Sequence, residues 1–222
     1  MANNPLPWTL KPQADIKPPE KVGMVIDLRR CVGCHACAVS CKTEHAVPLG
    51  SFRNRTQVVQ RPDSLKLSFV PMICMHCEDA PCLNACPSTA ITRELDGRVL
   101  VDEVRCDGNQ ECVGACPYGA IFFHPDKQVA SKCNLCEHRT EVGMPPACVE
   151  VCPTDALRFG DLADPADPLV ALHANESARP MKPEAKTQPR VVYMGLEPWM
   201  DDKLPGVQRA ADGEGEDGLT YE

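Results

Sequence analysis

Aromatic residues, excess positive charge and long apolar runs are all scarce in this chain of 222 residues. Aromatic residues make up only 5% of the chain, so we do not expect a large conventional hydrophobic core. The net charge of −8 argues against nucleic-acid binding, which requires clustered lysine and arginine. No run of 18 apolar residues occurs, and the N-terminal residues lack the form of a secretory signal. We therefore expect no direct membrane span.

Cysteine is the abundant exception, with 15 residues. An odd number does not suit a disulfide framework, and most of the cysteines lie only two or three residues apart, where bridging is strained. A zinc-stapled scaffold is an alternative, but zinc ribbons rarely carry three cysteines at successive x2 spacings followed by x3. The C-x2-C-x2-C-x3-C run from Cys31 to Cys41 is instead the spacing that holds iron–sulfur clusters, with the last cysteine directed to a neighbouring cluster.

Four related sets follow one another and account for every cysteine. The third set matches the first only if Asn109 is counted where a cysteine would stand, so sixteen positions less one leave the 15 cysteines. Three sets end in Cys-Pro and, after two further residues, continue with Ala and then Ile or Leu, which turns the chain away from the ligands and packs apolar groups beneath them. The sets are Cys31, Cys34, Cys37 and Cys41; Cys74, Cys77, Cys82 and Cys86; Cys106, Asn109, Cys112 and Cys116; and Cys133, Cys136, Cys148 and Cys152.

Asn109 marks one site as unusual. Because an amide is a weak neutral ligand for iron, the iron at this corner is either absent, leaving a three-iron cluster, or is held by another oxygen or nitrogen donor. Losing one thiolate makes the site less negative and favours its reduced form. We predict that the cluster bounded by Cys86, Cys106 and Cys112 is the atypical one.

Histidines also lie among the cysteines, but the cysteines already fill every ligand position except one. We expect His76 to pack beside a cluster or to donate a hydrogen bond, and we expect His45 and His173 at the surface. Bond-making chemistry has no candidate residues: no cysteine is left over as a nucleophile, and no glycine-rich loop follows a strand to bind a dinucleotide. The sequence predicts a non-catalytic carrier of single electrons.

Short apolar or alternating runs outside the sets predict strands at 23–27 and 98–102, and a hairpin formed by 56–60 and 65–70. Five prolines in residues 1–20 predict an extended N-terminal arm. Residues 166–222 carry further prolines and an acidic end, which predict an extended or disordered tail that binds a partner. Within this tail only 190–196 has an ordered pattern.

The pairing of the sets stays open from the residues alone. A short link between Cys86 and Cys106, with Asp96-Gly97 as a hairpin turn, joins the second and third sets into one two-cluster ferredoxin and leaves the first for the fourth. Likenesses between the first and third sets, and between the second and fourth, point instead to a tandem duplication.

In order and spacing, the sets over about residues 22–165, followed by Ala156-Leu-Arg-Phe-Gly-Asp-Leu162, resemble the iron–sulfur electron-transfer subunits of molybdopterin oxidoreductases of the dimethyl sulfoxide reductase family. The resemblance implies an α+β fold of two bacterial-type ferredoxin-like domains, one inserted in the other, with small β-hairpin insertions and an irregular C-terminal extension. The outer domain would comprise 21–50 and 118–165, and the inserted domain 51–117.

The resemblance also implies which cysteines share a cluster. Three clusters would be [4Fe-4S], and the one near Asn109 would be [3Fe-4S] or [4Fe-4S] with a non-cysteine corner. Related three-iron subunits usually place an aromatic residue at this position, so Asn109 departs from both patterns. The implied ligand sets are Cys31, Cys34, Cys37 with Cys152; Cys133, Cys136, Cys148 with Cys41; Cys74, Cys77, Cys82 with Cys116; and Cys106, Cys112 with Cys86 and the Asn109 corner.

The partners implied by the resemblance are a molybdopterin-containing catalytic subunit and a membrane anchor subunit that exchanges electrons with quinone. The expected substrates of such a complex are sulfur compounds such as sulfite, sulfoxide, thiosulfate or polysulfide, with selenium and arsenic oxyanions as alternatives. A subunit of a formate dehydrogenase or hydrogenase is the rival hypothesis, although such a subunit would often add a C-terminal transmembrane helix. We expect a cytoplasmic protein attached to the membrane through a partner, or alternatively a periplasmic protein exported with the catalytic subunit.

Overall fold

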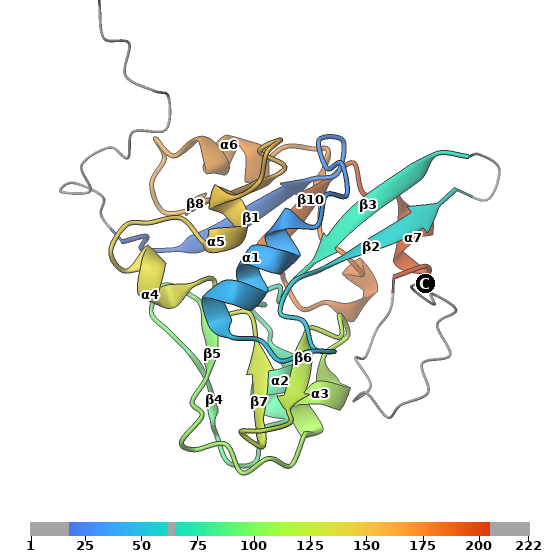
Figure 1. Cartoon of the computed structure of the whole chain (residues 1–222). Helices are drawn as coiled ribbons and strands as arrows, with labels where there is room; N and C mark the ends of the chain where they lie inside the picture. The colour runs from blue at the N-terminus through green and yellow to red at the C-terminus, as the bar shows by residue number, and fades with distance from the viewer. Residues whose placement is uncertain (1–17, 62–64, 205–222) are drawn as a thin grey trace, which may run out of the picture.

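The computed structural model describes residues 18–61 and 65–204, which form one sheet, three hairpins and several short helices (Figure 1). Most of the expected N-terminal arm, 1–20, lies outside the described residues. The elements are β1 (Val22–Asp27), α1 (Ala36–His45), β2 (Arg55–Gln60), β3 (Leu67–Met72), α2 (Pro81–Asn84), β4 (Ile91–Arg93), β5 (Val99–Val101), α3 (Glu111–Ala115), β6 (Ile121–His124), β7 (Val129–Lys132), α4 (Glu137–Thr140), α5 (Ala147–Glu150), β8 (Leu157–Asp161), α6 (Pro168–His173), β9 (Ala178–Arg179), the 3₁₀ helix η2 (Pro183–Ala185), β10 (Val191–Met194) and α7 (Pro198–Asp201).

A four-stranded sheet with the order β8-β1-β10-β9 forms one side of the core. Strand β1 pairs antiparallel with β8 and parallel with β10, and all six of its residues are buried because both faces of the sheet are covered. Alternate side chains serve the two faces: Met24 and Ile26 enter the main core, whereas Val25 packs under α6 with Leu169. Asp167 caps the start of α6: its carboxylate accepts the backbone N–H of Leu169 at 2.8 Å.

Three two-stranded hairpins complete the sheet structure, as β2 with β3, β4 with β5 and β6 with β7. The expected strands at 23–27 and 98–102 and the expected hairpin at 56–60 and 65–70 are confirmed. The turn between β4 and β5 contains Gly97 at a φ of 88°, a left-handed conformation that glycine adopts without strain. The fold is therefore α+β, as expected.

The expectation of an extended or disordered tail over 166–222 is wrong for its first part. Residues 168–201 form α6, β9, η2, β10 and α7, and β10 is an inner strand of the main sheet. Tyr193 is fully buried, and Leu196 and Met200 are almost fully buried, in this chain's own core. Parallel pairing of β10 with β1 thus places this segment in the core of the chain. Residues 205–222 lie outside the described residues.

The expected domain boundaries at 51 and 118 stay predictions, but two hairpins make contacts across them. The β6–β7 hairpin follows residue 118 but contacts β5 and α3, elements that lie before it. The β2–β3 hairpin follows residue 51 but contacts α1, and its Pro71 carbonyl accepts a 2.9 Å hydrogen bond from the Tyr193 hydroxyl of β10. In Figure 1 the β6–β7 hairpin lies with α2 and α3 at the bottom, and the β2–β3 hairpin lies beside β10.

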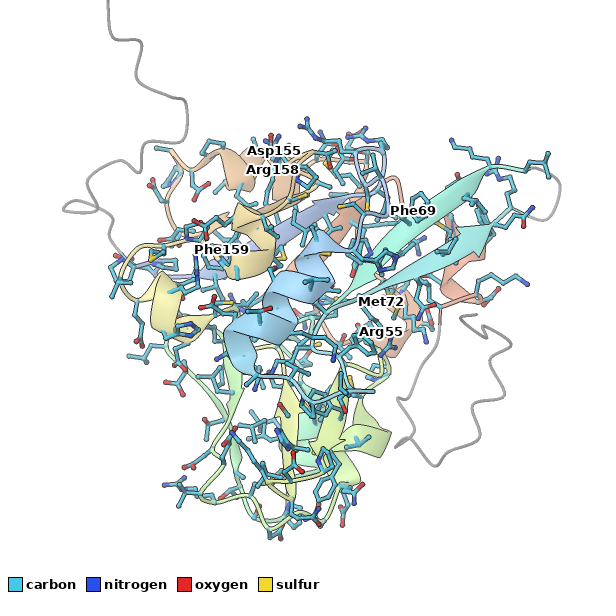
Figure 2. The ribbon with its side chains drawn as sticks, in the orientation of Figure 1. Arg55, Phe69, Met72, Asp155, Arg158 and Phe159 are labelled. Atoms are coloured by element: carbon cyan, nitrogen blue, oxygen red, sulfur yellow. The ribbon has the colours of Figure 1, made fainter. Side chains whose placement is uncertain are left out.

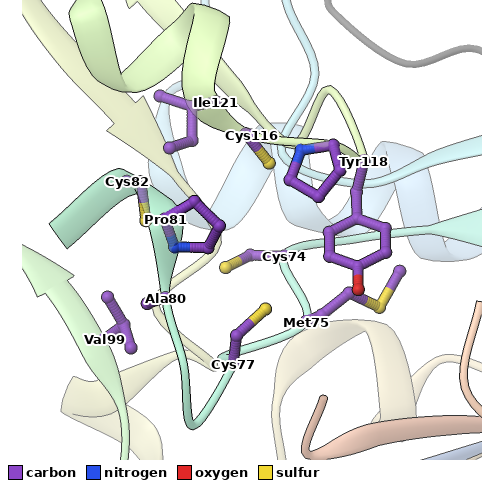
Figure 3. A pocket seen from close by; sticks show the side chains of 11 residues that line it. Cys74, Met75, Cys77, Ala80, Pro81, Cys82, Val99, Cys116, Tyr118 and Ile121 are labelled. Carbon is purple, nitrogen blue, oxygen red and sulfur yellow. The ribbon is translucent and has the colours of Figure 1, made fainter. Parts of the chain in front are cut away.

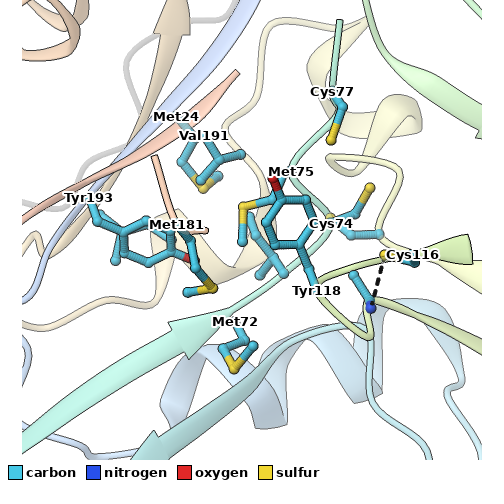
Figure 4. Close-up of a cluster of buried hydrophobic side chains, with 14 of the residues drawn as sticks. Met24, Met72, Cys74, Met75, Cys77, Cys116, Tyr118, Met181, Val191 and Tyr193 are labelled. Atoms are coloured by element: carbon cyan, nitrogen blue, oxygen red, sulfur yellow. Dashed lines mark hydrogen bonds between the residues drawn. The ribbon is translucent and has the colours of Figure 1, made fainter. Parts of the chain in front are cut away.

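Tyr193 provides a test of the C-terminal segment. Its fully buried ring packs among the methionines shown in Figure 4. We expect Tyr193→Ala to lower the free energy of unfolding by about 3–5 kcal/mol. Tyr193→Phe should lower it by about 1–3 kcal/mol, because the buried Pro71 carbonyl loses its donor.

Anaerobic urea denaturation of the full chain measures both effects. The control is Leu95→Ala, because Leu95 is fully exposed and its loss should change stability by no more than about 0.5 kcal/mol. If Tyr193→Ala were as mild as this control, β10 would not be part of the core.

Candidate functional site

The first cavity lies between the first and last cysteine sets. It is lined by the thiols of Cys31 and Cys34 from the loop before α1, by Cys37 in the first turn of α1, and by Cys152 from the loop after α5. Thr56 of β2 closes another side, with its hydroxyl 3.8 Å from the Cys37 sulfur. Four cysteines from opposite ends of the chain thus surround one space.

The second cavity gathers cysteines from the second and third sets. Cys74, Cys77 and Cys82 line it from one segment, and Cys116 lines it from the segment after α3, as Figure 3 shows. Apolar side chains such as Val99, Tyr118 and Ile121 form the rest of its wall. Its interior is therefore almost wholly sulfur and hydrocarbon.

The remaining cysteines form two further groups. Burial raises the pKa of Cys148, and the next contributions come from its neighbours Cys133, Cys136 and Cys41. Burial likewise raises the pKa of Cys112 to about 11, followed by the influence of Cys86 and Cys106. These neighbours are the ones expected for the last two ligand sets.

The four groups lie next to one another in a series. Cys37 of the first cavity is close enough to contribute to the raised pKa of both Cys41 and Cys148, after burial and closer thiols. Cys133 is buried; burial raises its pKa to about 12, and Cys74 of the second cavity is the next cause. Helices α2 and α3, which are in contact, connect the second cavity to the Cys86, Cys106 and Cys112 group.

Every set uses the same backbone turn at its second ligand position. The residue just before that position has a positive φ in all four sets: 68° at Gly33, 44° at His76, 76° at Gly108 and 54° at Leu135. The position that follows Gly108 is Asn109. The local backbone of the third set is thus the same as in the other three, although Asn109 stands where they have a cysteine.

The repeated Cys-Pro turns aim backbone N–H groups at sulfur. The third residue after each of these cysteines has a positive φ: 52° at Thr89, 55° at Gly119 and 49° at Asp155. The amide that follows then points back, so that Ala156 donates to the Cys152 sulfur at 3.3 Å and Ala120 donates to Cys116 at 3.5 Å (Figure 4). Such hydrogen bonds stabilise a thiolate and tune the potential of a bound cluster. The expectation that the Ala-Ile/Leu pairs are buried beneath the turns is confirmed.

Asn109 is exposed and engaged elsewhere. Its amide oxygen accepts the backbone N–H of Glu111 at 3.0 Å, and its amide nitrogen donates to the Asp107 carboxylate at 3.3 Å. The side chain therefore forms an Asx turn that accepts the first backbone N–H of α3.

The histidines have different surroundings from one another. His76 is fully buried, as expected beside a cysteine group, and its Nδ1 accepts the Val99 backbone N–H at 3.0 Å. Burial, followed by the charges of Lys132 and Arg98, lowers its pKa well below the usual range, so the ring is neutral. The expectation of a surface position is wrong for His45, which is half-buried with its Nε2 3.2 Å from the Cys136 sulfur, and also for the half-buried His173.

The chemistry of the donors fits iron–sulfur clusters. Burial raises the pKa of Cys77, Cys82 and Cys133 to about 12, so these thiols would stay protonated at neutral pH unless iron supplied positive charge. In the described ranges no three His, Cys, Asp or Glu side chains converge as ligands of a single metal ion do. The thiols instead surround cavities.

Comparison with known proteins agrees with this donor set. A family model described as a 4Fe-4S dicluster domain matches residues 65–162. A tetrathionate reductase subunit of Salmonella typhimurium is 44% identical over 187 residues, which cover 81% of this chain and 74% of that protein. A polysulfide reductase component of Wolinella succinogenes is 36% identical over 177 residues, covering 78% and 93%. A putative dimethyl sulfoxide reductase iron–sulfur subunit of Halobacterium salinarum is 36% identical over 219 residues, covering 82% and 84%.

This protein belongs to the iron–sulfur subunits of the molybdopterin reductases. The family resemblance drawn from the cysteine sets is thereby confirmed, together with a ferredoxin-like 4Fe-4S dicluster fold. Among residues 18–61 and 65–204, no helix has both the length and the apolar character needed to cross a lipid bilayer.

Sequence reasoning missed several residues that serve these groups. Thr56, His45 and Lys132 each place a polar atom within 4 Å of a cysteine sulfur, although none of them is itself a member of a ligand set. Their signals in the sequence were weak: a threonine in an alternating strand, a histidine four residues after Cys41, and a lysine next to Cys133.

Gly33 gives a test of the ligand loops. An added Cβ would lie 2.3 Å from the ring of Phe69 on β3, the residue labelled in Figure 2, and the φ of 68° disfavours any side chain. We expect Gly33→Ala to lower the free energy of unfolding by at least about 1–2 kcal/mol and to lower the iron content. Anaerobic denaturation and iron analysis measure the two effects.

Gly114 in α3 is the matched control. An added Cβ there would meet nothing within 4 Å, so Gly114→Ala should stabilise the helix by up to about 1 kcal/mol and leave iron unchanged. Equal behaviour of the two variants would contradict the proposed tightness of the first loop.

Proposed function

We propose that the chain relays single electrons through four iron–sulfur clusters between a molybdopterin-containing catalytic subunit and a quinone-reactive membrane subunit. The observation that carries this proposal is the distribution of thiol burial along the series. All eight cysteines of the two middle groups are buried, whereas Cys34 is exposed and Cys31, Cys152, Cys86 and Cys106 are partly exposed at the two ends. Electrons can enter and leave a relay only where a group lies near the surface, and the middle of the relay gains from exclusion of water.

The proposed cofactors are three [4Fe-4S] clusters and one atypical cluster. Support for the assignment comes from the shared cavities and from the neighbouring thiols described above. The proposed ligands are Cys31, Cys34, Cys37 and Cys152; Cys41, Cys133, Cys136 and Cys148; Cys74, Cys77, Cys82 and Cys116; and Cys86, Cys106 and Cys112, with the Asn109 corner open.

A nested arrangement of two ferredoxin-like units is part of the proposal. Helix α1 contacts α5 although about a hundred residues separate them, and α2 contacts α3 within the intervening segment. Each contact joins helices that follow cysteine loops. This supports an inner unit that includes the β6–β7 hairpin, inserted in an outer unit that includes β1 and β8.

The relatives favour a sulfur compound as the substrate of the complex. Their names include tetrathionate, thiosulfate, polysulfide and dimethyl sulfoxide reductases. A reductase for arsenate is also among them, so arsenic oxyanions are a second candidate. We assign the chain itself no bond-making chemistry, and we place it in the cytoplasm attached through its partner, or alternatively in the periplasm after co-export.

Iron analysis and EPR test the cofactor assignment. The anaerobically purified chain should contain about 15 iron atoms, against about 16 for four complete clusters, and its oxidised form should show the signal of a three-iron cluster. Asn109→Cys should add about one iron and remove that signal. Asn109→Ser keeps a side-chain oxygen that can accept the Glu111 N–H without adding a thiolate, so it should change neither the iron content nor the signal.

Two results would contradict parts of this assignment. About 16 irons and a silent oxidised state in the unchanged chain would favour a [4Fe-4S] cluster with a non-cysteine corner. A colourless protein, or one that contains zinc, would overturn the relay altogether.

Co-purification from the native host tests the partners. A tag on this chain should recover a large subunit that contains molybdenum or tungsten. The complex should oxidise a reduced dye with tetrathionate, thiosulfate, polysulfide or a sulfoxide, or should reduce a dye with sulfite. Dye reduction by formate or hydrogen would instead support the rival complexes.

A further inference from the structure

Lys132, the last residue of β7, is buried between the two middle cysteine groups. Lys132 is only 3% exposed, and Cys133 follows it directly in the sequence. Its Nζ donates to the Cys74 sulfur at 3.4 Å, to the Cys133 carbonyl at 3.1 Å and to the Val99 carbonyl. Three acceptors match the three N–H groups of an ammonium, so the charged form fits this site.

No carboxylate pairs with Lys132 in the described part of the chain. The nearby buried guanidinium groups do have such partners: Arg98 pairs with Asp96, and Arg190 pairs with Glu78. A buried charge is costly unless an opposite charge or hydrogen bonds compensate it, and lysine is almost never buried without a partner. The only anionic partner that the contacts offer Lys132 is sulfur, and a cluster with four thiolates carries net negative charge.

Lys132 contacts the sulfur of one of the two middle groups directly. Its Nζ lies 3.4 Å from the Cys74 sulfur, and Cys74 shares its cavity with Cys77, Cys82 and Cys116. In the neighbouring group Lys132 donates to the Cys133 backbone carbonyl, and the Cys133 sulfur accepts the Leu135 backbone N–H at 3.4 Å. Arg53 and Arg139 approach that neighbouring group, but Arg53 donates to the Ser131 hydroxyl and Arg139 pairs with Glu44 and Glu150.

We propose that Lys132 is the built-in counter-charge of the cluster held by Cys74, Cys77, Cys82 and Cys116, and that it makes this cluster the more readily reduced of the two buried ones. The inference rests on the proposed function. Each reduction adds one electron to a group that is already negative, and a positive charge in contact stabilises the product more than the reactant. This effect is stronger than at the surface because Lys132 and Cys74 are both buried, where the effective dielectric constant is lower than in water. The electron on the relay would therefore rest at this cluster.

Redox titration of the anaerobically purified full chain, followed by EPR, tests the proposal. Lys132→Met removes the charge, Lys132→Gln removes the charge but keeps two N–H donors, and Lys132→Arg keeps the charge. In both neutral variants we expect the reduced-to-oxidised ratio of one cluster, at a fixed potential, to fall at least tenfold, which is about 59 mV for one electron. In the Arg variant the ratio should stay within threefold of the unchanged chain.

The matched control is Lys127→Met, which removes the same charge from the turn of the same hairpin. Lys127 is half-exposed and paired with Glu103, so water already screens its charge. The reduced-to-oxidised ratios of all four clusters should therefore stay within threefold of those in the unchanged chain. Loss of iron from the two neutral variants, with full iron in the Arg variant, would also support a counter-charge.

Unchanged midpoints in the Gln variant, or loss of iron from all three Lys132 variants, would overturn the proposal. A failure of the relay itself is distinguishable, because the unchanged chain would then lack iron.

Discussion

The rest of this structure depends on one constraint, the close burial of many groups that must become anions. Fifteen thiols occupy a chain of 222 residues, and ten of them are buried. Desolvation and mutual repulsion both oppose their ionisation, as the raised pKa of Cys77, Cys82, Cys112 and Cys133 shows. Metal binding and folding are therefore coupled: iron and sulfide supply the cohesion that a chain with 5% aromatic residues lacks.

The groups that compensate the negative charge of the thiolates differ between the surface and the interior. The surface-near groups use neutral donors, since Ser88 lies 3.6 Å from the Cys86 sulfur and Thr154 lies 3.8 Å from Cys152. Although burial raises the pKa of both thiols, these hydroxyls and several backbone amides lower it below its ordinary value. The deeply buried groups have less access to water. There the backbone amides of Leu135 and Ala120 donate to sulfur, the Lys132 ammonium adds a charged donor, and the His45 ring lies 3.2 Å from the Cys136 sulfur. Solvent thus takes part in compensation at the two ends, and an ammonium and an imidazole supplement the backbone amides in the middle.

The cysteine sets and their local turns could be predicted because they depend on residues close in sequence. The spacing gives the ligand loops, Cys-Pro gives the turns, and Asp96-Gly97 gives the hairpin. The roles of His45, Lys132 and Tyr193 could not be predicted, because each depends on a contact made over a long sequence separation. His45 meets Cys136 across 91 residues, Lys132 meets Cys74 across 58, and Tyr193 meets Pro71 across 122.

The C-terminal segment makes long-range contacts of this kind with the loops that form the second cavity. Backbone carbonyls of Thr187 and Gln188 accept the N–H groups of Asp79 and Glu78, directly after Cys77. The Thr187 hydroxyl also bonds Tyr118, two residues after Cys116, and lowers the pKa of Cys77 against the effect of burial. One stretch therefore holds both loops that form the second cavity. Strand β10 comes directly after this stretch and pairs with β1, so the contacts to both loops are fixed to the central sheet. Residues that looked like a tail are in this way a structural part of a ligand group.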